Sequence, residues 1–200
     1  PITMTDSTLD PCWYVIATAD GIGDAPVPFE ILDQSYVLWR SKGGGLVAVK
    51  DRCSHREAKL SLGTVNDGCL QCPYHGWTFG DGGKCVAIPS SGPDATIPPA
   101  AHLAPLSVQE HYGLVWFCPS DPHQPVPHLE VEFDANFSRL NTSTELWNTS
   151  VTRMIDNMLD VAHFPYTHAG TFGREQELNL PNFTLEDLDG VLTDILDGKA

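Results

Sequence analysis

Residues 51–77 read DRCSHREAKLSLGTVNDGCLQCPYHGW and contain two short hooks, each of which combines a cysteine with a histidine. Cys53 and His55 have one residue between them, and sixteen residues later Cys72 and His75 have two between them. Two cysteines and two histidines can hold a tetrahedral zinc ion, or a [2Fe–2S] cluster with the cysteines on one iron and the histidines on the other. Zinc fingers usually pair like residues within a hook, so the mixed hooks favour the cluster over a zinc-binding interaction module.

The residues next to the second hook fit the same interpretation. Tyr74 and Trp77 flank its histidine and are expected to shield the cluster from water, which helps to set the reduction potential. Ordinary core packing is the alternative for these aromatic residues, and both can hold. The remaining cysteines are interpreted as buried thiols that pack like small apolar residues, namely Cys12, Cys69, Cys85 and Cys118.

Around the hooks, the first half of the chain has the pattern of a small antiparallel β domain, either a sandwich or a barrel. Short apolar or alternating runs rich in Val, Trp, Tyr and Phe predict strands, and glycine and proline separate them. These runs lie at 12–17, 36–40, 46–49, 69–72, 106–110 and 114–118. Prolines between residues 121 and 127 indicate a linker, so we expect one domain over 1–135 and the beginning of a second over 136–200.

The second half of the chain has a different character. Apolar residues at helical spacing predict a helix over 151–164, and Pro165 ends it or opens a turn. Two strands are predicted at 183–185 and 191–196, joined by a turn at Asp189–Gly190. The expected fold class is therefore α+β, with an antiparallel β domain that carries the hooks on loops, followed by the start of an α+β domain.

The predicted helix also carries polar residues at a regular interval. Asn157, Asp160 and His163 are three residues apart and lie near one face, and His168 follows the break at Pro165. Two neutral imidazoles so placed can bind Fe(II) together with one carboxylate, in a site that leaves positions open for O2 and substrate. Asp160 can accept a hydrogen bond from a ligand histidine and fix its tautomer. Read alone, this pattern is a weak signal, and a helix that carries these polar residues by chance is the more common interpretation.

Together, the two sets of residues resemble the α subunit of Rieske-type non-haem iron ring-hydroxylating oxygenases. The two hooks, followed by Gly76 and Trp77, are similar to the Rieske motif of that family. Residues 157–168 match the family pattern Asn-x-x-Asp-x-x-His-x-x-x-x-His at every position. The resemblance, which extends from Trp13 to about Phe172, implies a Rieske domain that binds a [2Fe–2S] cluster through the four hook residues.

The resemblance also implies roles for the residues of the second set. His163 and His168 would bind mononuclear Fe(II), and Asn157 would lie near that iron. Asp160 would be an electron bridge to the cluster ligand His75 of a neighbouring subunit in a ring, usually a homotrimer. The family takes a third iron ligand, an aspartate, from a helix far downstream. The acids that follow in this chain are too close in sequence to fit, so we expect the catalytic domain to be truncated here.

A member of this family is expected to be the oxygenase component of a multicomponent system. A ferredoxin, or a flavin reductase fed by NAD(P)H, would supply electrons, and O2 would oxidise a small organic, typically aromatic, substrate. Residues 58–63, AKLSLG, look like the monooxygenase and demethylase branch, such as the vanillate and methylxanthine demethylases. A cis-dihydroxylating dioxygenase is one alternative. A Rieske ferredoxin that only carries electrons is another, but it leaves residues 157–168 without a role.

The charge distribution bears on the partners of the chain. A net charge of −15 argues against nucleic acid. The segment 40–84 is locally basic, with seven Lys or Arg against four Asp or Glu, and it could steer an acidic electron donor. The docking residues expected there are Arg52, Arg56, Lys59 and Lys84, and a solvated surface without a partner is the alternative. The first residues lack a secretory signal and no apolar run could span a bilayer, so we expect a cytoplasmic location.

Overall fold

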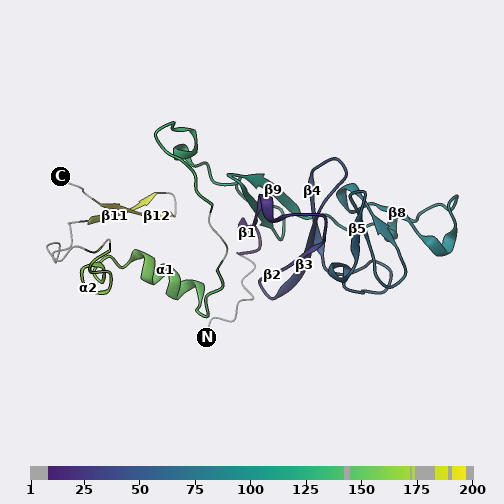
Figure 1. Ribbon diagram of the computed structural model, residues 1–200, viewed down its shortest axis with the longest axis horizontal. Coiled ribbons are helices and arrows are strands. Elements are labelled where there is room, and N and C mark those ends of the chain that lie inside the picture. The colour runs from purple at the N-terminus through teal and green to yellow at the C-terminus, as the bar shows by residue number, and fades with distance from the viewer. Residues whose placement is uncertain (1–8, 142–144, 172, 174–182, 189–190, 197–200) are drawn as a thin grey trace. The chain divides into compact units, whose positions relative to one another are not determined.

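The computed structural model describes residues 9–141, 145–171, 173, 183–188 and 191–196 (Figure 1). Its contacts divide the chain into two compact units, Pro1–Thr144 and Glu145–Ala200. The domain ranges 1–135 and 136–200 stay predictions.

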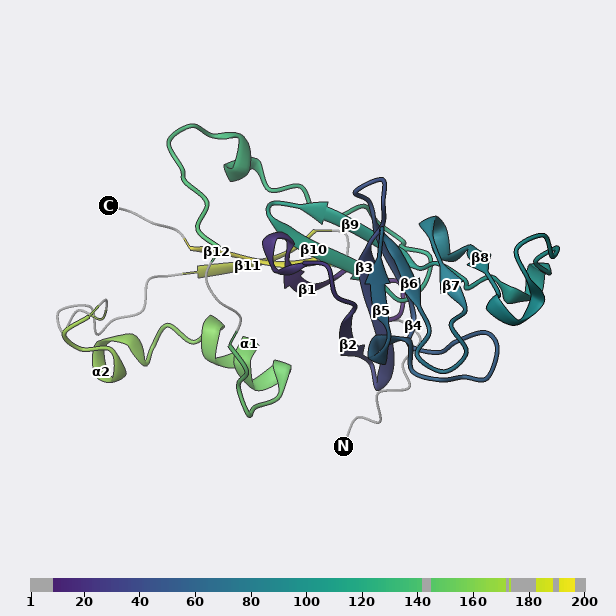
Figure 2. The same ribbon diagram turned by 45° about the vertical axis from the view of Figure 1, so that its right-hand side comes forward.

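Antiparallel strands form the described part of the first unit, in sheets of order β1-β10-β9, β2-β3-β4 and β5-β6-β7-β8 (Figure 2). The strands are β1 Tyr14–Thr18, β2 Val27–Ile31, β3 Gln34–Arg40, β4 Leu46–Lys50, β5 Thr64–Asn66, β6 Cys69–Gln71, β7 Thr78–Phe79, β8 Cys85–Ala87, β9 Ser107–His111 and β10 Leu114–Cys118. Short 3-10 turns connect them, namely η1 Ala19–Gly21, η2 Leu60–Leu62, η3 Asp81–Gly83, η4 Pro89–Ser91, η5 Pro99–Ala101 and η6 Glu130–Phe133. The predicted antiparallel β domain is confirmed.

Each predicted strand of this unit is present, within one or two residues at its ends. The strands that the sequence did not predict are β2, β5, β7 and β8, and each has a physical reason. Strand β2 contains Pro28, which is tolerated because β2 lies at the edge of its sheet. The other three are only two or three residues long, which is too short to show alternation.

Strand β3 is buried on both faces and separates two apolar clusters. Because side chains alternate along a strand, Val37 and Trp39 lie in one cluster, whereas Tyr36 and Leu38 lie in the other. The first cluster also contains both hook cysteines. The cysteine side of the candidate metal centre therefore belongs to the hydrophobic core.

The cysteines outside the hooks follow the prediction in part. Cys85 and Cys118 are buried, as expected. Cys12 is exposed and Cys69 is half-buried, which corrects the prediction for both. Cys12 lies in the turn that precedes β1, and Cys69 begins the short strand β6.

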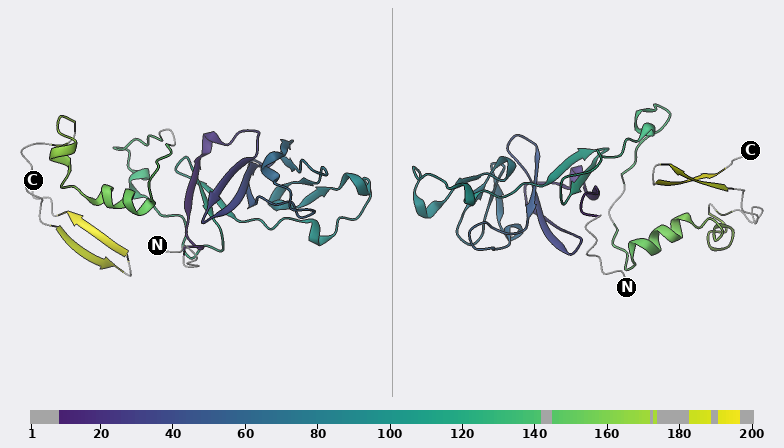
Figure 3. Two further views of the ribbon diagram at one scale, coloured as in Figure 1. Left: turned by 90° about the horizontal axis from the view of Figure 1, so that it is seen from below. Right: turned by 180° about the vertical axis from the view of Figure 1, so that it is seen from behind.

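The second unit contains α1 Val151–Leu159, the short helix α2 Phe164–Thr167, and strands β11 Phe183–Leu188 and β12 Val191–Leu196 (Figure 3). The two strands pair antiparallel, as the sequence predicted. The predicted turn at Asp189–Gly190 lies outside the described residues. No helix in the described part of the chain is long and apolar enough to cross a membrane.

The helix predicted over 151–164 ends earlier than expected. Helix α1 stops at Leu159, because Asp160 has an extended backbone and its Oδ1 accepts the N–H of Ala162 at 2.8 Å. Such local side-chain hydrogen bonds compete with the helical pattern. Pro165 then lies in the first turn of α2, where a missing N–H costs nothing.

Gly63 offers a test of packing next to the second hook. A Cβ built on Gly63 would lie 2.0 Å from the carbonyl oxygen of Gln71, the residue before Cys72. We expect Gly63→Ala to lower the free energy of unfolding by about 2 kcal/mol, since overpacking typically costs about 1–3 kcal/mol. Chemical denaturation measures this. Gly43→Ala is the control, because nothing lies within 4 Å of its Cβ, and equal loss in both variants would contradict the expectation.

Candidate metal centre

The first hook lies on a loop that leaves β4 and closes on itself immediately. The backbone N–H of Cys53 donates to the carbonyl of Ala58 at 2.9 Å, and the N–H of Glu57 donates to the carbonyl of Cys53 at 2.9 Å. The hydroxyl of Ser54 donates to the carbonyl of Ala101 at 2.7 Å. These bonds fix the cysteine and the backbone that leads to His55.

The second hook lies between β6 and β7 and repeats the same backbone pattern. The N–H of Cys72 donates to the carbonyl of Trp77 at 2.8 Å, and the N–H of Gly76 donates to the carbonyl of Cys72 at 3.1 Å. In both loops the fourth residue after the cysteine has a positive φ, 57° at Glu57 and 69° at Gly76. The two hooks are therefore equivalent in backbone conformation, although their sequences differ.

The four hook side chains are arranged as a cysteine pair and a histidine pair. Cys53 and Cys72 are 2% and 3% exposed, and their thiols are hydrogen-bonded neighbours. His55 and His75 are exposed, with ring centroids 4.6 Å apart at an interplanar angle of 63°. Within the described ranges, no three His, Cys, Asp or Glu residues gather around one point as ligands of a single ion would. Two pairs fit a two-iron cluster, in which each iron takes two protein ligands.

The protonation of these side chains follows from the same arrangement. Burial raises the pKa of the Cys53 thiol; the N–H groups of His55 and Arg56 oppose this, and the thiol of Cys72 adds to it. Ligation therefore has to release protons from the cysteine side. Desolvation lowers the pKa of His55, and the facing His75 and the cationic Arg56 lower it further. This favours the neutral imidazole, which is the form that binds metals.

Aromatic side chains lie against both histidines. The indole of Trp77 is stacked on His55, with centroids 4.6 Å apart and planes within 2°. The ring of Tyr74 lies 3.9 Å from His75 but is 64% exposed. Trp77 therefore packs on His55, and Tyr74 lies against His75. The sequence does not predict the first contact, because Trp77 is closer to His75 along the chain. The shielding role of these aromatic residues stays a prediction.

The second set of predicted residues is brought together around helix α2. His163 and His168 flank this four-residue helix, and their ring centroids are 5.2 Å apart. The Oδ2 atom of Asp160 lies 3.4 Å from Nδ1 of His163. Asn157 lies exposed on α1. The geometry gives two imidazoles that could share an ion, with a carboxylate placed to orient one of them.

The predicted docking residues do not have equal surroundings. Arg52 forms an ion pair with Glu57 at the side of the first loop. The side chains of Arg56, Lys59 and Lys84 are exposed, and no ion pair engages them in the described part of the chain. These three cations are therefore available to an acidic partner.

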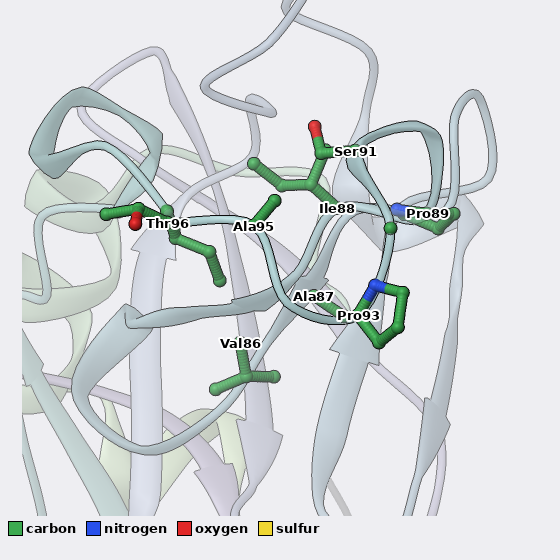
Figure 4. A pocket seen from close by; sticks show the side chains of 10 residues that line it. Val86, Ala87, Ile88, Pro89, Ser91, Pro93, Ala95 and Thr96 are labelled. Carbon is green, nitrogen blue, oxygen red and sulfur yellow. The ribbon is translucent and has the colours of Figure 1, made fainter.

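A pocket of about 310 Å³ lies within the loop that follows β8 (Figure 4). Apolar side chains such as Val86 and Ile97 line it, together with the hydroxyls of Ser91 and Thr96. The candidate metal ligands do not line this pocket. Pro89, from the same loop, lies 3.2 Å from the position of a Cβ built on Gly76 and so borders the second hook.

Comparison with known proteins gives related results for the two halves of the chain. Residues 12–107 match the Rieske [2Fe-2S] domain, and residues 147–199 match the vanillate O-demethylase oxygenase C-terminal domain. Chlorophyllide a oxygenase, chloroplastic, of Arabidopsis thaliana is 35% identical over 178 residues, which cover 87% of this chain and 32% of that protein. The vanillate O-demethylase oxygenase subunit of Pseudomonas sp. (strain HR199 / DSM 7063) is 34% identical over 185 residues, covering 90% and 51%.

The fold agrees with a solved structure of NdmA from Pseudomonas putida CBB5. The TM-score is 0.84 at 28% sequence identity, and the match covers 94% of this chain and 59% of that one. The relative described as methylxanthine N1-demethylase NdmA is 30% identical over 186 residues, which cover 89% of this chain and 52% of that protein. The chain thus spans about half the length of the two bacterial relatives and a third of the plant one. The expected fold class is confirmed.

Proposed function

We propose that this chain, which belongs to the Rieske-type non-haem iron oxygenases related to demethylases and monooxygenases, is the electron-receiving half of such an oxygenase. The cofactors of that family are a [2Fe–2S] cluster, which supplies one-electron transfer, and Fe(II), which supplies O2 activation. The observation that carries the proposal is the pairing of two buried cysteines with two exposed histidines on loops of equivalent backbone.

The hook residues have different tasks in this proposal. Cys53 and Cys72 hold the core side of the cluster, where water is excluded. His55 and His75 hold the outer side, where both residues are exposed to solvent. Because electron transfer weakens with distance, the exposed histidine edge is the natural point of entry and exit for electrons. Arg56, adjacent to His55, places a positive charge beside that edge.

We propose that His163 and His168 hold the Fe(II), and that the third ligand lies outside these 200 residues. Asp160 is close enough to His163 to orient its imidazole through Nδ1. In the oligomer we propose, a homotrimer, Asp160 also links this histidine to the His75 edge of a neighbouring subunit. Asn157 is proposed to lie near the iron, from its place on α1.

The proposed reaction is hydroxylation or oxidative demethylation of a small aromatic substrate, with O2 as oxidant and a ferredoxin or flavin reductase as donor. Two relatives are named as demethylases of vanillate and of a methylxanthine, which supports methyl oxidation over cis-dihydroxylation. The complete protein, supplied with NADH, a donor and O2, is expected to release formaldehyde from vanillate, a methylxanthine or a related methylated arene. A cis-diol product would reject the demethylase assignment, and reduction without any O2 uptake would leave only an electron carrier.

The docking proposal predicts that Arg56→Gln slows reduction by an acidic donor roughly tenfold at low ionic strength, because a steering charge is lost next to the exposed histidine edge. The difference should shrink as salt is added, since exposed charges are screened. Stopped-flow mixing with reduced donor measures the rate. Lys42→Gln is the matched control, because Lys42 is already paired with Asp67 at 2.5 Å. Equal slowing in both variants, or none in Arg56→Gln, would refute a docking role for Arg56.

A further inference from the structure

Asp51 is a buried carboxylate at the base of the first hook. It is 5% exposed and lies directly after β4, two residues before Cys53. Its Oδ1 accepts the backbone N–H of Ser61 at 2.8 Å, and its Oδ2 accepts the hydroxyl of Ser61 at 2.6 Å. Each carboxylate oxygen thus accepts a hydrogen bond from Ser61. No ion pair to Asp51 occurs among the residues that the structure describes.

The contact between Asp51 and Ser61 closes the loop that carries Cys53 and His55. Hydrogen bonds to a charged group are stronger than those between neutral groups. The two hydrogen bonds between Asp51 and Ser61, called the clasp from here on, are therefore well suited to hold the loop ends together. Within this loop, the backbone N–H of Cys53 donates to the carbonyl of Ala58. The contact between Asp51 and Ser61 lies outside this bond in the sequence and encloses it. Asp51 therefore joins the two ends of the loop that carries Cys53 and His55.

The clasp also reaches the second hook. Ser61 lies in η2, where Leu60 is fully buried in the same apolar cluster as both hook cysteines. Gly63, directly after η2, is packed against the carbonyl of Gln71, which precedes Cys72. The segment that Asp51 holds is thus the one against which the strand of the second hook packs.

The charge of Asp51 has a further consequence. Reduction adds a negative charge to the cluster, and a buried carboxylate nearby opposes this more strongly than an exposed one would, because little water screens it. The net charge around an iron–sulfur cluster is one of the quantities that set its reduction potential. The hydroxyl of Ser61 donates to this carboxylate and so offsets part of its charge.

We propose that Asp51 is a positioning residue of the cluster, which closes the first hook through Ser61 and holds the reduction potential down. The inference rests on the proposed function, because it requires that Cys53, His55, Cys72 and His75 hold the cluster. Through the reduction potential of the cluster, Asp51 would help to set the driving force for electron transfer from the donor.

The test is a redox titration of the cluster-loaded chain, poised at the wild-type midpoint potential. In Asp51→Asn, which keeps one oxygen acceptor but removes the charge, the ratio of reduced to oxidised cluster should rise from one to about ten, equivalent to about 59 mV for one electron. In Ser61→Ala, which keeps the charge but removes the hydroxyl, the ratio should fall below one. Ser61→Thr should restore the wild-type ratio. Asp81→Asn, which removes an exposed charge from the same unit, should leave it unchanged.

Opposite shifts in Asp51→Asn and Ser61→Ala are the signature of the carboxylate charge, because mere loosening of the loop would move both in the same direction. An unchanged ratio in Asp51→Asn, or equal shifts in both variants, would overturn the inference. If Asp51→Asn fails to fold, Ser61→Ala decides: a lower ratio supports the inference, and an equal or higher ratio overturns it. A wild-type chain without iron and sulfide would instead refute the proposed function.

Discussion

Cys72→Ser is expected to lose the [2Fe–2S] cluster, with its visible absorption and acid-labile sulfide. Cys72 is 3% exposed and lies beside the thiol of Cys53, so no other cysteine ligand can replace it without moving the core. Serine supplies an alcohol in place of the thiolate that iron–sulfur clusters require. Sulfide analysis and the visible spectrum after purification without oxygen measure the result.

Two further variants make this result specific. Cys69→Ser changes a half-buried cysteine in the adjoining strand β6 and should keep the cluster. His75→Ala removes an exposed side chain, so it should lose the cluster while circular dichroism shows an intact fold. A Cys72→Ser protein with wild-type sulfide would show that Cys72 is not a ligand.

Asp160→Asn is expected to keep both metal sites while substrate oxidation coupled to electron supply falls by about 100-fold, the upper range for residues that orient metal ligands. Asparagine keeps the shape of the side chain but removes the charge that faces Nδ1 of His163 at 3.4 Å. The measurement is product formed per electron supplied in the complete protein, together with iron content.

The control for this variant is Asp156→Asn, which changes an exposed aspartate one helical turn earlier on α1. It should retain wild-type coupling. Wild-type turnover in Asp160→Asn would remove the bridging role from Asp160. Loss of iron in that variant would instead show that Asp160 takes part in holding the metal.

The sequence was sufficient to predict most strands of the first unit, because strands depend on local order. The role of the hooks stays a prediction. The spacing of cysteine and histidine indicates an iron–sulfur cluster. Apolar runs such as Leu46–Val49 indicate strands. Strand β2 escaped prediction because Pro28 argues against a strand unless its position at a sheet edge is known. Helix α1 was overestimated because the side chain of Asp160 makes a local bond that spacing does not predict.

Side-chain contacts between separate loops, or between the two ends of one loop, could not be predicted from the sequence. The stacking of Trp77 on His55 depends on how the two loops converge. The hydrogen bonds between Asp51 and Ser61 join the two ends of a loop. The length of that loop does not by itself predict that its ends meet. The ion pair that occupies Arg52, and leaves Arg56 available, is likewise a product of the folded loop.

The central claim is that the hooks hold an iron–sulfur cluster, and a metal and sulfide analysis of protein purified without oxygen tests it most directly. For the 200-residue chain, the account predicts about two irons and about two acid-labile sulfides, without zinc. For the complete protein it predicts about one more iron, held by His163, His168 and a ligand beyond Ala200. Zinc without sulfide in either protein would contradict the account.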